Sequence, residues 1–350
     1  MAAEMSLSEW VERFLPDLYR PGTPLSMVPL CGDAGFRSYS RVSSRPTLLA
    51  VSAPPEHENN AAFVNIALLL KAQGVHAPRI IAVDYAQGYL LLEDFGDQLL
   101  LPLLNEQTVD VLYTKAESAL QAIQQIDVSV HPLADYDRSM LLAEMNLFPE
   151  WFVGKLLGIE LSVPEQQLLS TTFEILVDSA LSQPQVLVHR DYHSRNLMLL
   201  ENNDIGVIDF QDAVTGPFTY DLVSLLRDCY IRWSAELVSR RALNYYRRAV
   251  AAGIATPVSD KQFFRWFDLM GLQRHIKVLG IFARLYLRDG KAGYLNDLPL
   301  VIRYTLEQLD SYPELNEFKA WFEQRVLAAV ESQPWYQPWQ QAGDSQRELL

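Results

Sequence analysis

Short apolar runs separated by glycine and proline turns dominate the first 96 residues, and this pattern predicts a small sheet. The stretches expected to be extended are 26–42, 47–53, 79–85 and 89–93. The first of them carries a glycine-bearing turn near its middle, which predicts a hairpin. Segment 58–73 instead has apolar residues at helical spacing, and Gly74 suits the end of that helix. We therefore expect a sheet that carries one helix.

A short amphipathic helix is expected before this sheet, over residues 6–20. Ser6 or Ser8 would cap its N-terminus, and Trp10, Phe14 and Leu18 would lie on one face.

From about residue 107 onward the apolar positions recur every three or four residues, which predicts helices. One long helix begins there, and further helices are expected at 165–182, 219–230, 235–252, 261–289 and 315–332. Residues 185–209 are strand-like, and the chain becomes polar after Pro334. The pattern predicts an α+β protein with two lobes, a small β-rich lobe (1–96) and a larger, mainly helical lobe (97–350).

Composition narrows the classes of function. The chain has 350 residues and a formal net charge of −14, so a broad surface for nucleic acid or anionic lipid is not expected, although a local phosphate pocket is compatible with this charge. Cys31 and Cys229 lack the spacing of a disulfide scaffold or a zinc site. The acidic N-terminus does not resemble a secretory signal, and no apolar run has the length that spans a bilayer. These features predict a soluble, cytoplasmic protein.

Candidate chemistry gathers around a predicted hairpin late in the chain. Residues 197–200 and 205–208 are apolar, and 201–204 have the composition of a turn. If Leu197 pairs with Ile208, then Asn196 lies opposite Asp209 where the strands open. An amide oxygen beside a carboxylate is a suitable pair of Mg²⁺ ligands.

Asp191 lies on the loop before this hairpin. Phosphoryl transfer needs positioning, charge neutralisation and a carboxylate that accepts the proton of the acceptor hydroxyl. Asp191 supplies that carboxylate as the expected catalytic base. Asp191, Asn196 and Asp209 could instead be ordinary turn residues, because Asp and Asn are common in turns. Their joint spacing around one hairpin argues against that interpretation.

These residues resemble the catalytic motifs of protein-kinase-like enzymes. The resemblance rests on HRD at 189–191, Asn196 five residues later and IDF at 208–210. His193 and Gln211, with GP at 216–217 and YDL at 220–222, are similar to the aminoglycoside-phosphotransferase and choline-kinase branch. The resemblance implies a bilobal kinase that uses ATP and Mg²⁺, with nucleotide bound by the first lobe and catalysis and substrate binding in the second.

Other segments resemble the bacterial anomeric N-acetylmuramate/N-acetylglucosamine kinases of cell-wall recycling. They are CGDAGFR at 31–37, APPE at 53–56, LLEDFG at 91–96, RHIKVLGIFAR at 274–284, RDGK at 288–291 and YL at 294–295. This resemblance implies that the γ-phosphate is transferred to the anomeric hydroxyl of an N-acetylated amino sugar. Nucleotide and sugar are then the partners, and the sequence does not indicate an oligomeric state.

The nucleotide site departs from the family pattern. The lysine that such kinases carry on strand three is absent from 47–53, so Arg37 and Arg41 are the candidates to replace it. Gly32 and Gly35 are expected to bring backbone N–H groups to the phosphates. By resemblance, the backbone around Glu93 and Phe95 would bind adenine.

Several further residues have more than one interpretation. His189 and His193 are assigned to support of the catalytic loop, and Asp221 to a helix cap or a brace for that loop. Asp212 is either an acidic group near the acceptor or a solvated residue. Glu144, Asn146 and Trp151 are candidates for the sugar site, although Trp151 also fits a core position.

Arg274, His275, Lys277 and Arg284 recur at spacings that place them on one helical face. We interpret most of them as a solvated basic stripe. The alternative is a pocket for the lactyl carboxylate of N-acetylmuramate, with Arg274 as a substrate residue.

Two other functions stay open. One is a kinase for a cationic small molecule of the aminoglycoside or choline type, which the acidic net charge favours. The other is a nucleotide-binding pseudokinase, which the missing lysine favours and the joint presence of Asp191, Asn196 and Asp209 opposes.

Overall fold

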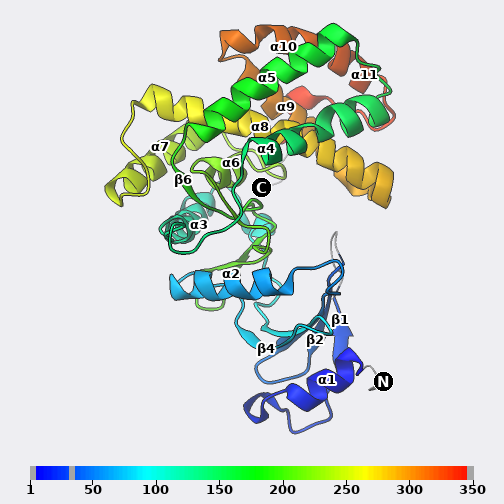
Figure 1. Cartoon of the computed structure of the whole chain (residues 1–350), viewed down its shortest axis with the longest axis vertical. Coiled ribbons are helices and arrows are strands. Elements are labelled where there is room, and N and C mark those ends of the chain that lie inside the picture. Colours follow the sequence, from blue (N-terminus) through cyan, green and yellow to red (C-terminus); the bar gives the residue numbers. More distant parts are fainter. Residues whose placement is uncertain (1–4, 31–35, 345–350) are drawn as a thin grey trace. The chain divides into compact units, whose positions relative to one another are not determined.

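The structure is a computed structural model that describes residues 5–30 and 36–344. The chain forms two compact units (Figure 1). The first comprises Met1–Ile123 and Arg195–Ala213, and the second comprises Gln124–Ser194 and Val214–Leu350. The segment with Asn196 and Asp209 therefore belongs to the first unit, whereas Asp191 belongs to the second.

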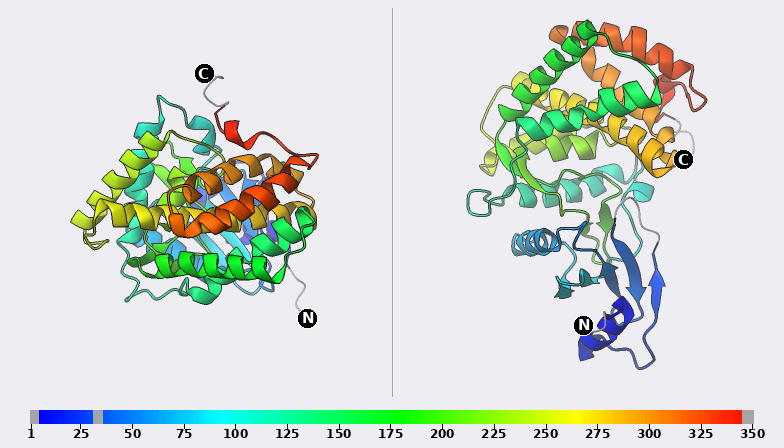
Figure 2. Two further views of the ribbon diagram at one scale, coloured as in Figure 1. Left: turned by 90° about the horizontal axis from the view of Figure 1, so that it is seen from above. Right: turned by 45° about the vertical axis from the view of Figure 1, so that its right-hand side comes forward.

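A five-stranded antiparallel sheet forms the centre of the first unit, in the order β1-β2-β3-β5-β4. Its strands lie side by side in the right-hand view of Figure 2. The strands are β1 (Met27–Pro29), β2 (Ser38–Val42), β3 (Leu48–Ser52), β4 (Ile80–Asp84) and β5 (Tyr89–Glu93). The predicted strands are confirmed, and β3 and β5 are mostly buried, as their apolar runs indicate.

The N-terminal helix α1 (Leu7–Phe14) is shorter than predicted. Ser6 caps it in a reciprocal box with Glu9, whose carboxylate accepts the Ser6 backbone N–H at 2.8 Å. The helix ends before Leu15 because Pro16 disfavours helical backbone at the residue before it. A 3₁₀ turn, η1 (Asp17–Tyr19), follows.

The predicted apolar face of α1 was also partly wrong. Trp10 and Val11 are buried against the sheet, whereas Phe14 and Leu18 are 47% and 73% exposed.

Helix α2 (Asn60–Ala72) confirms the predicted helix of the first lobe. The Asn59 side chain accepts the Ala62 N–H at 3.0 Å, and Gly74 takes a left-handed backbone conformation after the helix.

The first unit also contains the hairpin β7 (Leu197–Leu199) and β8 (Ile205–Val207), together with the 3₁₀ turn η2 (Leu101–Leu103). Two backbone bonds hold the hairpin, from Leu100 N–H to Leu197 O and from Val207 N–H to His76 O, both 2.8 Å. A Cβ on Gly206 would lie 2.7 Å from the Phe95 ring, so this position requires glycine.

The second unit is mainly helical. Its first elements are the end of α3 (Val109–Gln124), α4 (Arg138–Met145), the π-helix η3 (Phe148–Leu156) and α5 (Val163–Leu181). The strands β6 (Gln185–Val188) and β9 (Val214–Pro217) pair, and α6 (Tyr220–Leu226), α7 (Ala235–Ala251) and α8 (Asp260–Asp289) follow them in the chain. The last elements are η4 (Ala292–Asn296), α9 (Leu298–Leu309), η5 (Pro313–Leu315), α10 (Asn316–Trp321), η6 (Phe322–Leu327), α11 (Ala328–Glu331) and η7 (Trp339–Gln341).

Helix α8 is the central element of this unit and packs against η3, α9, α5, α6 and α4 (Figure 1). Gly280 lets η3 approach closely, since a Cβ there would lie 2.4 Å from the Leu147 carbonyl carbon. Because α8 is surrounded, several of its charged residues lie inside the unit. Within the described part of the chain, no helix is both long and apolar enough to cross a membrane.

Candidate active site

The loop after β6 contains Asp191 and is held at its start by Asp221. The Asp221 carboxylate accepts the backbone N–H of His189 at 2.7 Å and of Arg190 at 3.1 Å. Arg190 adopts a left-handed backbone (φ 76°), which a non-glycine residue rarely does without such support. Burial raises the pKa of Asp221 to about 7, although these two hydrogen bonds oppose the rise. Asp221 therefore fixes the turn that precedes Asp191.

The same loop is held at its other end by Asp228. The Ser194 backbone N–H donates to the Asp228 carboxylate at 2.9 Å, and the Ser194 hydroxyl donates to the same oxygen. His189 is buried, and its Nδ1 accepts the Asp191 N–H at 3.2 Å. The His193 ring meets the Tyr230 ring edge-on at 5.4 Å. The backbone around Asp191 is thus fixed on both sides.

The charges around Asp191 favour its ionised form. Burial alone raises the pKa of Asp191, but electrostatic attraction by Lys277, by the neighbouring His193 and His189 rings and by Arg274 outweighs it, and the pKa lies below its ordinary value. Asp191 is therefore a carboxylate at neutral pH, as a proton acceptor must be.

A buried ion cluster surrounds Glu144. Lys277 Nζ lies 3.0 Å from Glu144 Oε2, and the Arg190 guanidinium pairs with the other carboxylate oxygen. Lys277 also donates to the Tyr220 hydroxyl at 2.9 Å, and the Tyr136 hydroxyl donates to Glu144. Burial raises the pKa of Glu144, but the charges of Lys277 and Arg190 lower this pKa by more than burial raises it. The carboxylate therefore stays ionised.

The predicted solvated basic stripe was wrong for three of its four residues. Arg274, His275 and Lys277 are 3%, 0% and 6% exposed, and only Arg284 is partly exposed. Arg274 donates to Cys229 Sγ at 3.2 Å. The prediction failed because helical spacing does not distinguish a wet face from one that meets buried polar partners.

The buried His275 ring is neutral. Gln308 donates to Nδ1 at 2.9 Å, and Nε2–H donates to the Arg227 carbonyl at 3.1 Å, a pair of bonds that one neutral tautomer satisfies. Burial lowers the pKa of His275 to about 3.

In the first unit, the hairpin brings Asn196 and Asp209 together in a register that differs by one residue from the prediction. Leu197 pairs with Val207 rather than with Ile208. The loop begins one residue earlier than the apolar run suggests, because Leu200 N–H bonds to Asp204 O at 2.9 Å. Asp209 takes a left-handed backbone (φ 65°), and its Oδ2 still accepts from Asn196 Nδ2 at 3.2 Å.

This pair has the donor chemistry that Mg²⁺ uses. Its carboxylate and amide oxygens are hard ligands, and magnesium in kinases takes one or two protein ligands beside phosphate and water. Gln211 Nε2 donates to the other Asp209 oxygen at 2.8 Å and so orients the carboxylate. Among the described residues, no group of three or more His, Cys, Asp or Glu side chains is arranged to hold a metal ion.

Arg37 lies over the first of two stacked rings, and the second ring belongs to the residue that follows Asp209. Its guanidinium lies 4.8 Å from the centre of the Phe63 ring, which stacks on Phe210 at 4.9 Å. Phe210 directly follows Asp209 in the chain. Arg37 also pairs with Glu58 at 3.0 Å, and both side chains are mostly buried. This ion pair joins Arg37, which directly precedes β2, to Glu58, which lies just before α2, and it holds the Arg37 guanidinium in place.

Arg41, the other candidate, is already engaged. Its Nε donates to Asp94 at 2.6 Å and its Nη2 to Asp97 at 2.9 Å. Two carboxylates compensate its charge, so the geometry favours Arg37 over Arg41 as a phosphate ligand.

The remaining candidates belong to different elements of the chain. Gly32 and Gly35 lie outside the described residues. Glu93 pairs with Arg79 at 3.0 Å, and Phe95 packs on Gly206. Asp212 and Asn146 are exposed, and Trp151 is partly buried with Lys155 Nζ 3.5 Å from its ring centre.

Three residues of the site were missed by sequence reasoning. They are Glu58, Asp228 and Tyr230. A lone carboxylate or tyrosine in a loop has no pattern of its own, and only the fold shows that Asp228 meets the loop after β6 or that Glu58 meets Arg37.

Comparison with known proteins places the chain among phosphotransferases. The model of the phosphotransferase enzyme family (APH) matches residues 26–254. A Pseudomonas aeruginosa protein named N-acetylmuramate/N-acetylglucosamine kinase is 43% identical over 89% of this chain and 93% of its own length. A Neisseria meningitidis protein of the same name is 38% identical over 90% and 93%.

Solved structures show the same fold at low identity. A Plasmodium vivax ethanolamine kinase has a TM-score of 0.58 at 13% identity and covers 80% of this chain and 82% of its own. A GDP complex of an aminoglycoside 2'-phosphotransferase has a TM-score of 0.57 at 16% identity and covers 85% and 96%. The bilobal, protein-kinase-like α+β fold predicted from the sequence is thereby confirmed.

Proposed function

The chain belongs to the phosphotransferase enzyme family (APH), and on that premise we propose that it is an amino-sugar 1-kinase. It transfers the γ-phosphate of ATP, with Mg²⁺, to the anomeric hydroxyl of N-acetylglucosamine, N-acetylmuramate or both. The relatives' names support the acceptor, since the chain shares 43% and 38% identity with two of them over nearly their full lengths. We place this reaction in the cytoplasm, where ATP is available.

Asp191 is the base in this proposal. The acceptor oxygen attacks the γ-phosphorus, the bond from that phosphorus to the ADP oxygen breaks, and Asp191 takes the hydroxyl proton. The observation that carries this role is a carboxylate kept ionised by nearby cations on a loop fixed by Asp221 and Asp228. An anomeric hydroxyl is more acidic than an ordinary alcohol, so a carboxylate of low pKa suffices as its base.

Asn196 and Asp209 would hold Mg²⁺, which neutralises charge on the phosphates when it is bound. Arg37 would contact the phosphates in place of the missing strand lysine, because its guanidinium lies next to the Phe63–Phe210 pair that leads to Asp209. The backbone at Glu93–Phe95 would hold adenine. We assign nucleotide binding to lobe 1–96 and catalysis to lobe 97–350.

Coupled ADP release tests the proposal. N-acetylglucosamine, N-acetylmuramate, glucosamine, choline and kanamycin are offered in parallel to the protein and to Asp191→Asn. We expect turnover on the N-acetylated sugars, a loss of at least about 10²-fold in the variant, and phosphate on C1 in the NMR spectrum of the product.

Other outcomes select the alternatives. Turnover on choline or kanamycin alone would keep the phosphoryl transfer and replace the acceptor. Nucleotide binding without turnover on any of the five compounds would favour the pseudokinase.

A further inference from the structure

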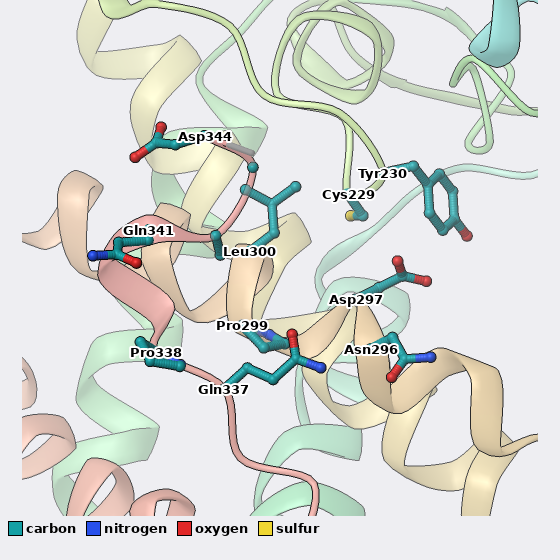
Figure 3. Close-up of a pocket in the computed structure, with 12 residues that line it drawn as sticks. Cys229, Tyr230, Asn296, Asp297, Pro299, Leu300, Gln337, Pro338, Gln341 and Asp344 are labelled. Carbon is teal, nitrogen blue, oxygen red and sulfur yellow. The ribbon is translucent and has the colours of Figure 1, made fainter. Parts of the chain in front are cut away.

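A polar cavity of about 540 Å³ lies in the second unit (Figure 3). Its size falls within the roughly 300–1,000 Å³ that small-molecule sites occupy. One side is formed by Cys229 and Tyr230 and by Asn296 and Asp297, and the facing wall is formed by Gln337, Pro338 and residues 341–344. Amides and carboxylates supply most of its polar groups, and Tyr230 supplies an aromatic ring.

The segment between α6 and α7 connects this cavity to the catalytic loop. Asp228 bonds to Ser194, Tyr230 packs on His193, and Cys229 accepts a hydrogen bond from Arg274, one of the cations that lower the pKa of Asp191. Three consecutive residues therefore touch the machinery around Asp191, while Cys229 and Tyr230 also line the cavity. A molecule bound there would lie next to that loop.

Arg303 of α9 holds the facing wall of the cavity in place. Arg303 donates to the Ala342 carbonyl at 2.8 Å and pairs with Asp344 at 2.9 Å, and Arg232 lies 3.7 Å from the same carboxylate. The charge of Asp344 is thus compensated by two arginines. The amides of Asn296, Gln337 and Gln341 also line the cavity and can recognise a ligand.

We propose that this cavity is the acceptor subsite and that Gln337, Pro338 and residues 341–344 form its specificity wall. The inference rests on the proposed sugar-kinase function. Amide side chains both donate and accept, which suits ring hydroxyls and a neutral acetamide group, and an aromatic ring packs on the apolar face of a pyranose. The wall lies beyond residue 254, where the match to the family ends, so acceptor choice is carried by residues outside the part of the chain that the family shares.

The test compares Asn296→Ala and Gln337→Ala with Gln340→Ala, which changes an exposed glutamine of the same segment that does not line the cavity. Initial rates give KM for N-acetylglucosamine and for ATP, and calorimetry gives the Kd for the sugar with ADP and Mg²⁺ present. We expect the sugar KM and Kd to rise about threefold to tenfold in the first two variants, as for one lost hydrogen bond. The KM for ATP and all constants of Gln340→Ala should stay unchanged.

Two different failures are separable. If the unaltered protein phosphorylates and binds N-acetylglucosamine and both cavity variants keep its constants, the cavity is not the acceptor subsite, while the sugar-kinase function stands. If the unaltered protein neither binds nor phosphorylates the sugar, the proposed function itself fails and this inference falls with it. A rise of the ATP KM together with the sugar KM would indicate general distortion and would also overturn the assignment.

Discussion

At the scale of single residues, Lys277 is the largest of the nearby electrostatic influences that favour the ionised form of Asp191. Its charge lowers the pKa of that carboxylate, which burial alone would raise. An ion pair with Glu144 and a hydrogen bond to Tyr220 fix the position of Lys277. Lys277→Met removes a positive charge, so the pKa of Asp191 should rise. The base is then protonated at higher pH, and we expect the acidic limb of the kcat/KM profile to move upward in pH.

The matched variant for this prediction is Lys277→Arg, which keeps the charge. Its acidic limb should stay near that of the unaltered protein even if kcat falls. An acidic limb that does not move in Lys277→Met would show that Lys277 contributes packing only. Profiles of kcat/KM are the correct measurement, because they report the pKa of the free enzyme.

Arg37 and Arg41 give a second residue-scale prediction. Arg37 pairs with Glu58 and lies over the Phe63 ring, which stacks on Phe210 next to Asp209, whereas Arg41 is engaged by two carboxylates. Arg37→Ala should raise the KM for ATP by roughly tenfold, the size of a lost charge-assisted hydrogen bond. Arg41→Ala should leave that KM within about twofold. An unchanged KM in Arg37→Ala removes Arg37 from the phosphate site.

At the scale of elements, the close approach of α8 to η3 depends on Gly280. A Cβ there would lie 2.4–2.6 Å from backbone atoms of Leu147 and Phe148, which cannot turn aside as a flexible side chain does. Gly280→Ala should therefore cost about 1–3 kcal/mol of unfolding free energy, as overpacking typically does. Gly293→Ala is the control, since nothing lies within 4 Å of its Cβ and its backbone is not left-handed.

Urea denaturation of both variants checks this prediction. We expect a lower midpoint for Gly280→Ala with an unchanged slope and a midpoint close to that of the unaltered protein for Gly293→Ala. Equal midpoints for the two variants would mean that η3 moves away from α8 without loss.

Elements also show what the sequence could and could not predict. Apolar runs bounded by turn residues were sufficient for β3 and β5, which are mostly buried, and helical spacing was sufficient for α2, which buries one face. Helix α9 was missed because almost all of it is buried, which removes the contrast between apolar and polar faces. The predicted register of the hairpin was wrong by one residue because Leu200, an apolar residue that the pattern assigned to a strand, lies in the loop.

The same reasoning applies to the site. Asp191, Asn196 and Asp209 stand out in the sequence because their spacing around a turn is rare, and the hairpin does bring Asn196 to Asp209. Their roles as base and metal ligands stay predictions. The burial of Lys277 and Arg274 could not be foreseen, because it depends on tyrosines and a cysteine that are distant in the chain.

At the scale of the whole molecule, the boundary between the two compact units falls inside the proposed catalytic motif, between Ser194 and Arg195. Asn196 and Asp209 belong with the strands and with Arg37, whereas Asp191 belongs with α8 and the acceptor cavity. The residues proposed to bind the nucleotide therefore belong to the first unit, and those proposed to bind the acceptor sugar belong to the second. Each ligand should stabilise a different part of the chain.

Hydrogen exchange read by mass spectrometry tests this division. ADP with Mg²⁺ should slow exchange mainly in residues 36–123 and 195–213, because ligand binding protects the backbone of the unit that holds the ligand. N-acetylglucosamine should slow exchange mainly around residues 228–230 and 296–344. Asp209→Asn should lose most of the Mg²⁺-dependent protection and keep the protection by sugar, because the cavity residues do not include the hairpin. Protection of 296–344 by nucleotide alone, or of 195–213 by sugar alone, would contradict the assignment of both sites.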